Sequence, residues 1–275
     1  MPTDQRSIMA VLAHPDDESF GVAGAFRRYA DLGYSVSLIC GTRGEVGEIS
    51  DPSFATPESL GEVREGELRT ASDFMGITDL KFLDYRDGSL NKADTSEATG
   101  KIVRQIRRLR PQVIVTFDAN GGYGHLDHIA IHYLTVAAFT LAAQPSAYPE
   151  QILEGLEPYA PSRLYAVAML DSSMKKMLGE MQAQGINFLP GGDAATIPLE
   201  EMGTPDERVA IEMILTDSEY EAKMNAMAAH RTQMPASSPL NSLSDEARRQ
   251  WLGTERFALL RSHGPLASDL FDGIA

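Results

Sequence analysis

Short runs of apolar residues alternate along the chain with longer segments in which apolar positions recur at helical spacing. The apolar runs that predict strands are 8–13, 35–40, 80–83, 113–117 and 164–170. The segments that predict helices are 18–32, 59–75, 96–109 and 125–143, and Gly33, Gly76 and Pro111 stand where three of them should end. Strands that alternate with helices in this way form parallel sheets covered by crossover helices. We therefore expect an α/β fold, a Rossmann-like three-layer sandwich with a mostly parallel central sheet.

The C-terminal part of the chain has a weaker pattern. Two further helices are predicted over 217–231 and 243–252, and two strands over 209–215 and 256–260. Between 183 and 205, three prolines and four glycines interrupt any periodicity, which predicts a long loop or an insertion. The chain has no internal repeat, no low-complexity tract and no clear interdomain linker. We expect residues 1–275 to form a single domain.

Composition narrows the classes of partner. A chain of 275 residues with 43% hydrophobic residues can bury a sizeable core. Its formal net charge of -15 disfavours nucleic acid, because binding to phosphates requires clustered lysine and arginine. No apolar run reaches the about 18 residues of a membrane span, and the single cysteine, Cys40, lies in a predicted strand as a buried thiol. We expect a cytoplasmic protein with a small-molecule partner, and homo-oligomerisation stays open.

The first candidate site follows the first predicted strand, where the sequence is Ala13-His14-Pro15-Asp16-Asp17-Glu18. Open parallel sheets bind ligands at the carboxyl ends of their strands. A nucleotide-binding fold would have a glycine-rich turn here, whereas this turn offers an imidazole and three carboxylates, which favour a cation. His14 and Asp17 can both reach one ion while Asp16 points elsewhere. The alternative is that the acidic residues cap the helix and that His14 only occupies a turn.

A second candidate site follows the fourth predicted strand. The glycine-rich loop 121–124 leads into His125, Asp127 and His128, and it should emerge at the same edge of the sheet as the first site. Of two histidines three residues apart at a helix start, one can reach a metal while the other faces a substrate, with Asp127 as an orienting group. The alternative for an isolated pair is packing or capping. His132 lacks the glutamate of a His-Glu-x-x-His site, so we expect an ordinary helix position for it.

These two motifs resemble those of the PIG-L/LmbE-like deacetylases, zinc enzymes that remove the N-acetyl group from N-acetylglucosamine conjugates. The resemblance rests on residues 13–18 and on Gly124-His125-Leu126-Asp127-His128. Further landmarks occur in the order typical of the family, namely 42–45 (TRGE), 62–68 (EVREGEL), 83–88 (LDYRDG) and 230–233 (HRTQ). Leu126 stands where the family is expected to have proline, and the segment 183–205 has no counterpart that we can place.

The resemblance implies a metal site and a general base. Matched position by position, it implies that His14, Asp17 and His128 bind Zn²⁺ and that Asp16 is the general base. It also implies that His125 stabilises or protonates the reacting centre. Three protein ligands would leave zinc an open position for water. Iron or another divalent ion stays open, because nitrogen and oxygen ligands do not settle the choice of metal.

The resemblance also implies roles for three further residues, in orienting a ligand and in binding substrate. The resemblance implies that Asp127 orients a histidine and that Arg64 and Asp87 hold the sugar hydroxyls. From the residues alone, Arg64 can instead pair with a carboxylate of its own helix, and Asp87 can simply build a turn.

The positions together predict hydrolysis of an N-acyl amide, expected to be N-acetyl, on a glucosamine-type sugar conjugate, with release of the free amine and a carboxylate. One alternative keeps the metal and enlarges the substrate to a thiol-sugar, glycopeptide or other natural-product conjugate. Another alternative is a sugar- or nucleotide-binding protein without catalysis. Asp16 and His125 disfavour it, because a binding protein has no use for a base beside an open metal site.

Overall fold

The computed structural model describes residues 5–183, 195–198, 201–235, 238, 240, 243–264 and 268–274. The strands of this part of the chain form a seven-stranded sheet in the order β3 (Asp79–Phe82), β2 (Ser35–Cys40), β1 (Ser7–Leu12), β4 (Val113–Thr116), β5 (Arg163–Val167), β7 (Thr254–Ser262) and β6 (Val209–Ile214). The first five are parallel, and β7 runs antiparallel to both β5 and β6. The predicted mostly parallel sheet is confirmed, including its two C-terminal strands.

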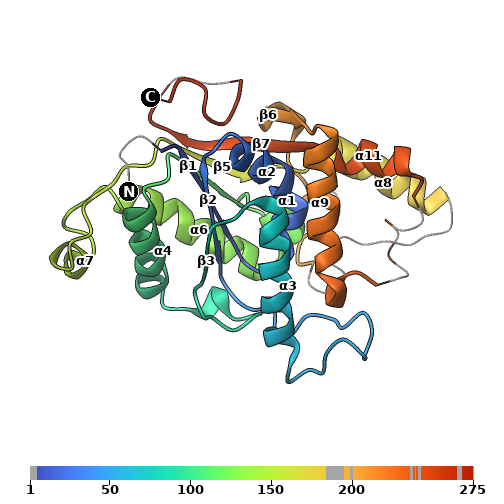
Figure 1. Cartoon of the computed structure of the whole chain (residues 1–275), viewed down its shortest axis with the longest axis horizontal. Coiled ribbons are helices and arrows are strands. Elements are labelled where there is room, and N and C mark those ends of the chain that lie inside the picture. The colour runs from blue at the N-terminus through green and yellow to red at the C-terminus, as the bar shows by residue number, and fades with distance from the viewer. Residues whose placement is uncertain are drawn as a thin grey trace.

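Helices cover both faces of the sheet (Figure 1). One face is covered by α2 (Ala23–Asp31), α3 (Leu60–Met75) and α9 (Asp217–Ala229), and the other by α4 (Thr95–Leu109) and α6 (Leu126–Leu141). The shorter or more peripheral helices are α1 (Asp17–Gly21), α5 (Gly121–Gly124), α7 (Pro149–Leu153), α8 (Asp171–Ala183) and α11 (Asp245–Leu252). The three layers form the predicted α/β sandwich.

The central strand β1 is buried on both faces. Ile8, Ala10 and Leu12 belong to the apolar cluster that includes residues of α2, α3 and α9, whereas Met9 and Val11 belong to the cluster with α4 and α6. Successive side chains of a strand point to opposite faces, so a strand between two helix layers needs apolar residues at every position. The sheet core therefore lies on both sides of β1, and the loop that follows this strand starts from a rigid base.

The helix predicted over 18–32 is divided at Val22, which corrects that prediction. Val22, with φ −139°, lies between α1 and α2. The break frees the first-turn N–H groups of Gly24 and Ala25, which donate to the carboxylate of Glu255 at 2.9 and 2.8 Å. The break depends on a residue of β7, distant in sequence, and local periodicity carries no sign of it.

Other differences from the predicted elements lie around β5. The sequence pattern does not predict α7, which is five residues long, or α8 after β5. The strand predicted over 164–170 ends at Val167. Of the loop predicted over 183–205, residues 184–194, 199 and 200 lie outside the described part of the chain. Among the described residues of the whole chain, no helix has the length and apolarity needed to cross a membrane.

A buried ion pair joins α9 to β7. Lys223 Nζ donates to Glu255 at 2.9 Å and to the carbonyl oxygen of Phe20 at 2.8 Å, and both charged side chains are at most 2% exposed. We expect Glu255→Gln to lower the free energy of unfolding by about 3–5 kcal/mol, because it leaves the ammonium buried without its counter-charge. Urea unfolding measures the loss. Lys175→Gln, in an exposed pair with Asp171, should leave the unfolding midpoint unchanged, and an equal loss from both changes would contradict the prediction.

Candidate active site

The carboxyl ends of β1 and β4 lie side by side where the strand order changes direction. Open parallel sheets form their ligand-binding crevice at such a point. His14 follows β1, and the loop after β4 leads into α6, which carries His128. His14 Nδ1 and His128 Nε2 lie 3.1 Å apart although the residues are 114 positions apart in the sequence. The two motifs therefore converge at one edge of the sheet.

The side chains of three potential metal ligands meet at this edge. Asp17 Oδ1 lies 3.3 Å from His128 Nε2, and Asp17 Oδ2 lies 3.7 Å from His14 Nδ1. The other ring nitrogens have acceptors of their own, since His128 Nδ1 faces the Gly121 carbonyl oxygen at 3.2 Å and His14 Nε2 faces carboxylates. If those nitrogens carry the protons, two lone pairs and a carboxylate point at one another. That arrangement is unfavourable unless a cation lies between them.

The separations suit a tetrahedral metal ion. Ligand atoms about 2.0–2.2 Å from a tetrahedral Zn²⁺ lie roughly 3.3–3.6 Å from one another. Within the described residues, ligand atoms of His14, His125 and His128 also lie within 4.8 Å of one another, as do those of His14, Asp87 and Asp127. His14 belongs to both groups, so its ring lies at the centre of the candidate ligand atoms.

Two carboxylates hold the far edge of the His14 ring. His14 Nε2 lies 3.0 Å from Asp87 Oδ1 and 3.4 Å from Asp127 Oδ2. Asp127 is itself fixed by two backbone N–H groups of the loop after β3, at 2.8 and 2.9 Å. Burial alone would lower the pKa of His14, but hydrogen bonds to Asp127 and Asp87 and the charge of Asp17 raise it to about 10. The site therefore favours a positive charge here, and Asp127 lies where it can orient His14.

Asp16 lies beside this cluster in a strained backbone conformation. Its φ is 114°, which non-glycine residues rarely adopt. Its N–H donates to Glu18 Oε2 at 3.0 Å, and its carboxylate accepts from Arg64 Nη2 at 3.1 Å. Burial raises the pKa of Asp16 to about 6, against the opposing charge of Arg64. The carboxylate is thus fixed next to Asp17 by Arg64 and by the turn.

His125 caps α6 and faces the same cluster. Its Nδ1 accepts from the N–H of Asp127 at 3.1 Å, so a neutral ring carries its proton on Nε2. The ring centroid lies 4.6 Å from that of His14 and 4.8 Å from that of His128. Burial lowers the pKa of His125 to about 4, and the charges of His14 and His128 act in the same direction. His125 is therefore a neutral hydrogen-bond donor at pH 7.

Arg64 and Asp87 are both buried against the cluster. Arg64 is 3% exposed, and its guanidinium donates to two loop carbonyl oxygens in addition to Asp16. Asp87 is 7% exposed and accepts a backbone N–H at 3.2 Å besides its contact with His14. The contact of Arg64 or Asp87 with sugar hydroxyls stays a prediction.

Three side chains near the cluster have no assigned role in the sequence pattern. The ring of Tyr123 lies 5.2 Å from that of His128, and burial raises the pKa of Tyr123, so it presents a neutral hydroxyl. Glu18 and His230 form a buried pair. Tyr123 directly precedes the second motif, and His230 stands in the landmark 230–233, but neither position by itself reveals a contact.

Thr196 and Ile197 lie against the glycine loop. The Thr196 hydroxyl donates to the carbonyl oxygen of Gly124, where an added Cβ would lie 2.9 Å from Ile197. Gly122 also has a positive φ but no atom within 4 Å of such a Cβ.

We expect Gly122→Ala to cost about 1 kcal/mol of stability through its backbone alone. Gly124→Ala should in addition displace His125 and lower kcat/KM by up to about 100-fold. Thermal unfolding and kinetics of both variants measure this, and equal kinetic effects would contradict it.

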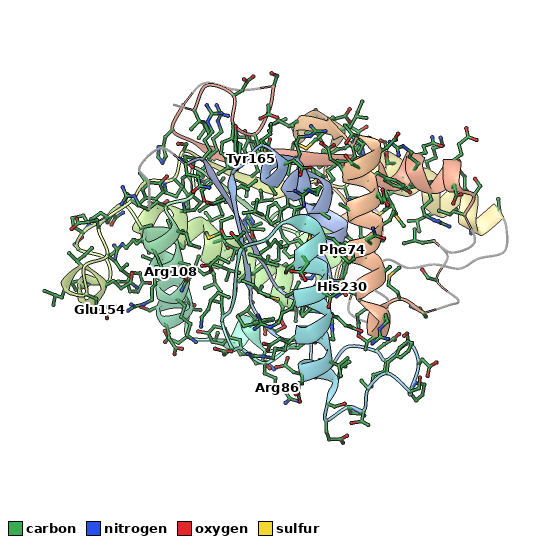
Figure 2. The ribbon with its side chains drawn as sticks, viewed as in Figure 1. Phe74, Arg86, Arg108, Glu154, Tyr165 and His230 are labelled. Carbon is green, nitrogen blue, oxygen red and sulfur yellow. The ribbon has the colours of Figure 1, made fainter. Side chains whose placement is uncertain are left out.

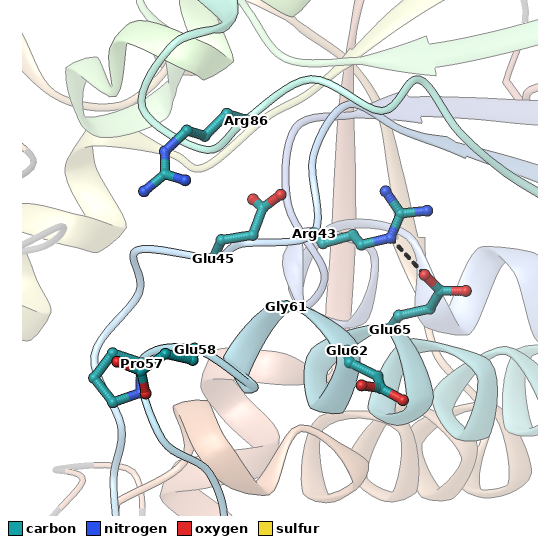
Figure 3. Close-up of a pocket in the computed structure, with 8 residues that line it drawn as sticks. All are labelled: Arg43, Glu45, Pro57, Glu58, Gly61, Glu62, Glu65 and Arg86. Carbon is teal, nitrogen blue, oxygen red and sulfur yellow. Dashed lines mark hydrogen bonds and ion pairs between the residues drawn. The ribbon is translucent and has the colours of Figure 1, made fainter.

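A cavity of about 640 Å³ lies at the N-terminal end of α3 (Figure 3). Its lining residues are Arg43, Glu45, Pro57, Glu58, Gly61, Glu62, Glu65 and Arg86. Arg43 and Glu65 pair across part of it at 2.5 Å. Glu45 accepts the backbone N–H of Asp87 at 3.1 Å, so the cavity adjoins the cluster through Asp87. Its lining includes none of the candidate metal ligands.

One family model and several known relatives match this chain. A family model described as PIG-L, GlcNAc-PI de-N-acetylase, matches residues 9–139, which include both motifs. A 1D-myo-inositol 2-acetamido-2-deoxy-alpha-D-glucopyranoside deacetylase from Streptomyces avermitilis is 35% identical over 295 residues, which cover 98% of each chain. A relative of the same description from Thermobifida fusca is 35% identical, and the match covers 95% of this chain and 94% of the relative.

The fold is also similar to that of solved structures. N,N'-diacetylchitobiose deacetylase from Pyrococcus horikoshii, complexed with an inhibitor, superposes with a TM-score of 0.69 over 94% of this chain and 84% of its own. The sequences are 20% identical, so this likeness concerns the fold alone.

Proposed function

The chain belongs to the PIG-L family, and from this premise we propose that it hydrolyses the N-acetyl amide of a glucosamine-type sugar conjugate with the help of a divalent metal. Water adds to the acetyl carbonyl carbon, the carbon–nitrogen bond breaks, and acetate and the free amine are released. The observation that carries the proposal is the convergence of His14, Asp17 and His128 within 3.1–3.7 Å beside Asp16. The relatives that match almost the whole chain are deacetylases.

We assign the metal to His14, Asp17 and His128. The set of two imidazoles and a carboxylate suits Zn²⁺, and iron or another divalent ion is the alternative. A divalent ion bound there supplies a Lewis acid that polarises the amide carbonyl and lowers the pKa of water. Asp87 and Asp127 accept from Nε2 of His14, which leaves its Nδ1 lone pair free for the metal.

Asp16 is the proposed general base. Arg64 holds its carboxylate, which can take the proton of the attacking water. A cation nearby would lower the pKa of Asp16 from about 6, so the ionised form prevails at neutral pH. The leaving amine needs a proton, and we assign this step to protonated Asp16 because the low pKa of His125 makes it a scarce acid.

His125 is proposed to stabilise the negative charge that develops on the carbonyl oxygen. Its Nδ1 is occupied by the N–H of Asp127, so Nε2–H is the donor available to substrate. A donor fixed by a helix cap needs little reorganisation as charge develops. The neutral ring therefore complements Asp16, which handles the proton.

The proposed substrate is an N-acetylglucosaminide joined to a polyol. Relatives at 35% identity are named for an inositol conjugate of this kind. The cavity at α3 adjoins Asp87 and is lined by carboxylates and guanidinium groups, which can bind the hydroxyl groups of a polyol. The acetamide would then lie at the metal and the polyol toward the cavity.

The test measures bound metal and primary-amine release in the same preparation. The panel contains free N-acetylglucosamine, an N-acetylglucosaminyl polyol and a bulky N-acyl glycopeptide. We expect bound divalent metal and chelator-sensitive release that is fastest with the polyol conjugate. Release only from the glycopeptide would transfer the function to a larger conjugate. Absence of divalent metal, or release that a chelator does not affect, would overturn the proposal.

A further inference from the structure

A buried pair connects the first motif to a distant part of the chain. Glu18 Oε1 lies 2.7 Å from His230 Nε2, although the residues are 212 positions apart, and both side chains are 1% exposed. His230 directly follows α9, and Figure 2 labels it between α3 and α9. Neither the metal site nor the proposed chemistry uses this pair directly.

The other oxygen of Glu18 holds the backbone of Asp16. Glu18 Oε2 accepts the N–H of Asp16 at 3.0 Å, while Oε1 accepts the Ser19 hydroxyl at 2.5 Å in addition to its contact with His230. The φ of 114° at Asp16 is a conformation that persists only where surrounding contacts determine it. The orientation of the Glu18 carboxylate is therefore linked to the conformation of the turn.

We propose that His230 is a positioning residue for the base. It fixes Glu18 Oε1, and Oε2 then keeps the Asp16 turn in the conformation that presents its carboxylate to the substrate. This inference rests on the proposed function and adds a residue that acts through Glu18 without touching the reacting atoms.

The segment that begins at His230 also binds the helix that carries Arg64, the second partner of Asp16. Thr232 donates to the carboxylate of Glu67 from its backbone N–H at 2.9 Å and from its hydroxyl at 2.7 Å. Glu67 lies one turn after Arg64 on α3, and Arg64 Nη2 donates to the Asp16 carboxylate at 3.1 Å. One short segment thus contacts Glu18, which holds the backbone of Asp16, and the helix whose Arg64 holds the Asp16 side chain.

A stabilising role alone does not account for the Glu18–His230 pair. Apolar side chains of similar volume often stabilise a core as well as a buried ionic pair does. His230 Nδ1 also meets no hydrogen-bond partner among the described residues, which is unfavourable for a buried polar atom. The pair is better explained by the orientation that it gives to Glu18.

The test compares kcat, KM and bound metal in variants of the full chain, with an N-acetylglucosamine conjugate that the wild type hydrolyses. His230→Ala should lower kcat about 10–100-fold, while KM and metal content change less than about twofold. His230→Gln, whose amide can donate to Glu18, should recover most of this loss. Arg107→Met is the matched control, because Arg107 is 2% exposed and donates to the Gln144 carbonyl at 2.8 Å, between α6 and α7. It should lower the Tm and leave kcat unchanged.

A double-mutant cycle tests whether His230 acts through Glu18. Glu18→Gln keeps an acceptor for the N–H of Asp16 but turns an amide toward His230. Adding His230→Ala to this variant should therefore lower kcat no further. Additive losses, an unchanged kcat in His230→Ala or a parallel loss of metal would overturn the inference. A wild-type chain that binds metal but releases no amine from any conjugate would overturn the proposed function instead.

Discussion

Asp16→Asn is expected to lower kcat at least about 100-fold and to leave the bound metal near its wild-type content. Asparagine keeps the size of the side chain and an oxygen that can accept from Arg64, but it cannot take a proton. It also tolerates the φ of 114° better than alanine, so the turn should keep its conformation. Steady-state deacetylation and elemental analysis of one preparation measure both quantities.

Asp84→Asn is the matched control for this change. Asp84 also has a positive φ, 62°, and pairs with Arg43 at 2.8 Å, but its side chain is 59% exposed. We expect this variant to have wild-type kcat. Loss of metal from Asp16→Asn would make Asp16 a ligand, and a kcat within a few-fold of the wild type would assign the base to another group.

The parallel sheet could be predicted from the sequence because its central strands are buried on both faces. Every residue of β1 and of β4 is buried, and all except the terminal Ser7 and Thr116 are apolar, so each strand stands out as an apolar run. The convergence of the two motifs then follows from a general rule, since loops at the carboxyl ends of neighbouring parallel strands share one edge. The convergence of the two motifs could therefore be predicted from the sequence.

The residues that support the site could not be placed in this way. The pairs Glu18–His230 and Glu255–Gly24 join segments 212 and 231 positions apart, and local spacing carries no sign of either contact. Arg64 has charged neighbours on its own helix, which favour a surface ion pair, yet the structure buries it against the Asp16 turn. These contacts depend on how α3 and α9 dock against the loop after β1, which is a property of the assembled fold.

His128→Ala is expected to abolish metal binding and deacetylation together. The change removes Nε2, which lies 3.1 Å from His14 Nδ1 and 3.3 Å from Asp17 Oδ1. The loss of activity should exceed the roughly 10–100-fold that follows removal of an outer partner of a metal ligand, because the ion itself is lost. Elemental analysis after dialysis and the amine-release assay measure the two losses.

His132→Gln separates ligand loss from damage to the helix. His132 lies about one turn after His128 on α6, is 5% exposed, and has Nδ1 2.7 Å from the carbonyl oxygen of Phe117. The His132→Gln variant should keep its metal and its activity. Equal metal loss in His132→Gln and His128→Ala would point to disruption of α6. Added Zn²⁺ should restore chelator-treated wild type but not His128→Ala. Metal retained by His128→Ala would instead point to His125, whose ligand nitrogen lies within 4.8 Å of those of His14 and His128.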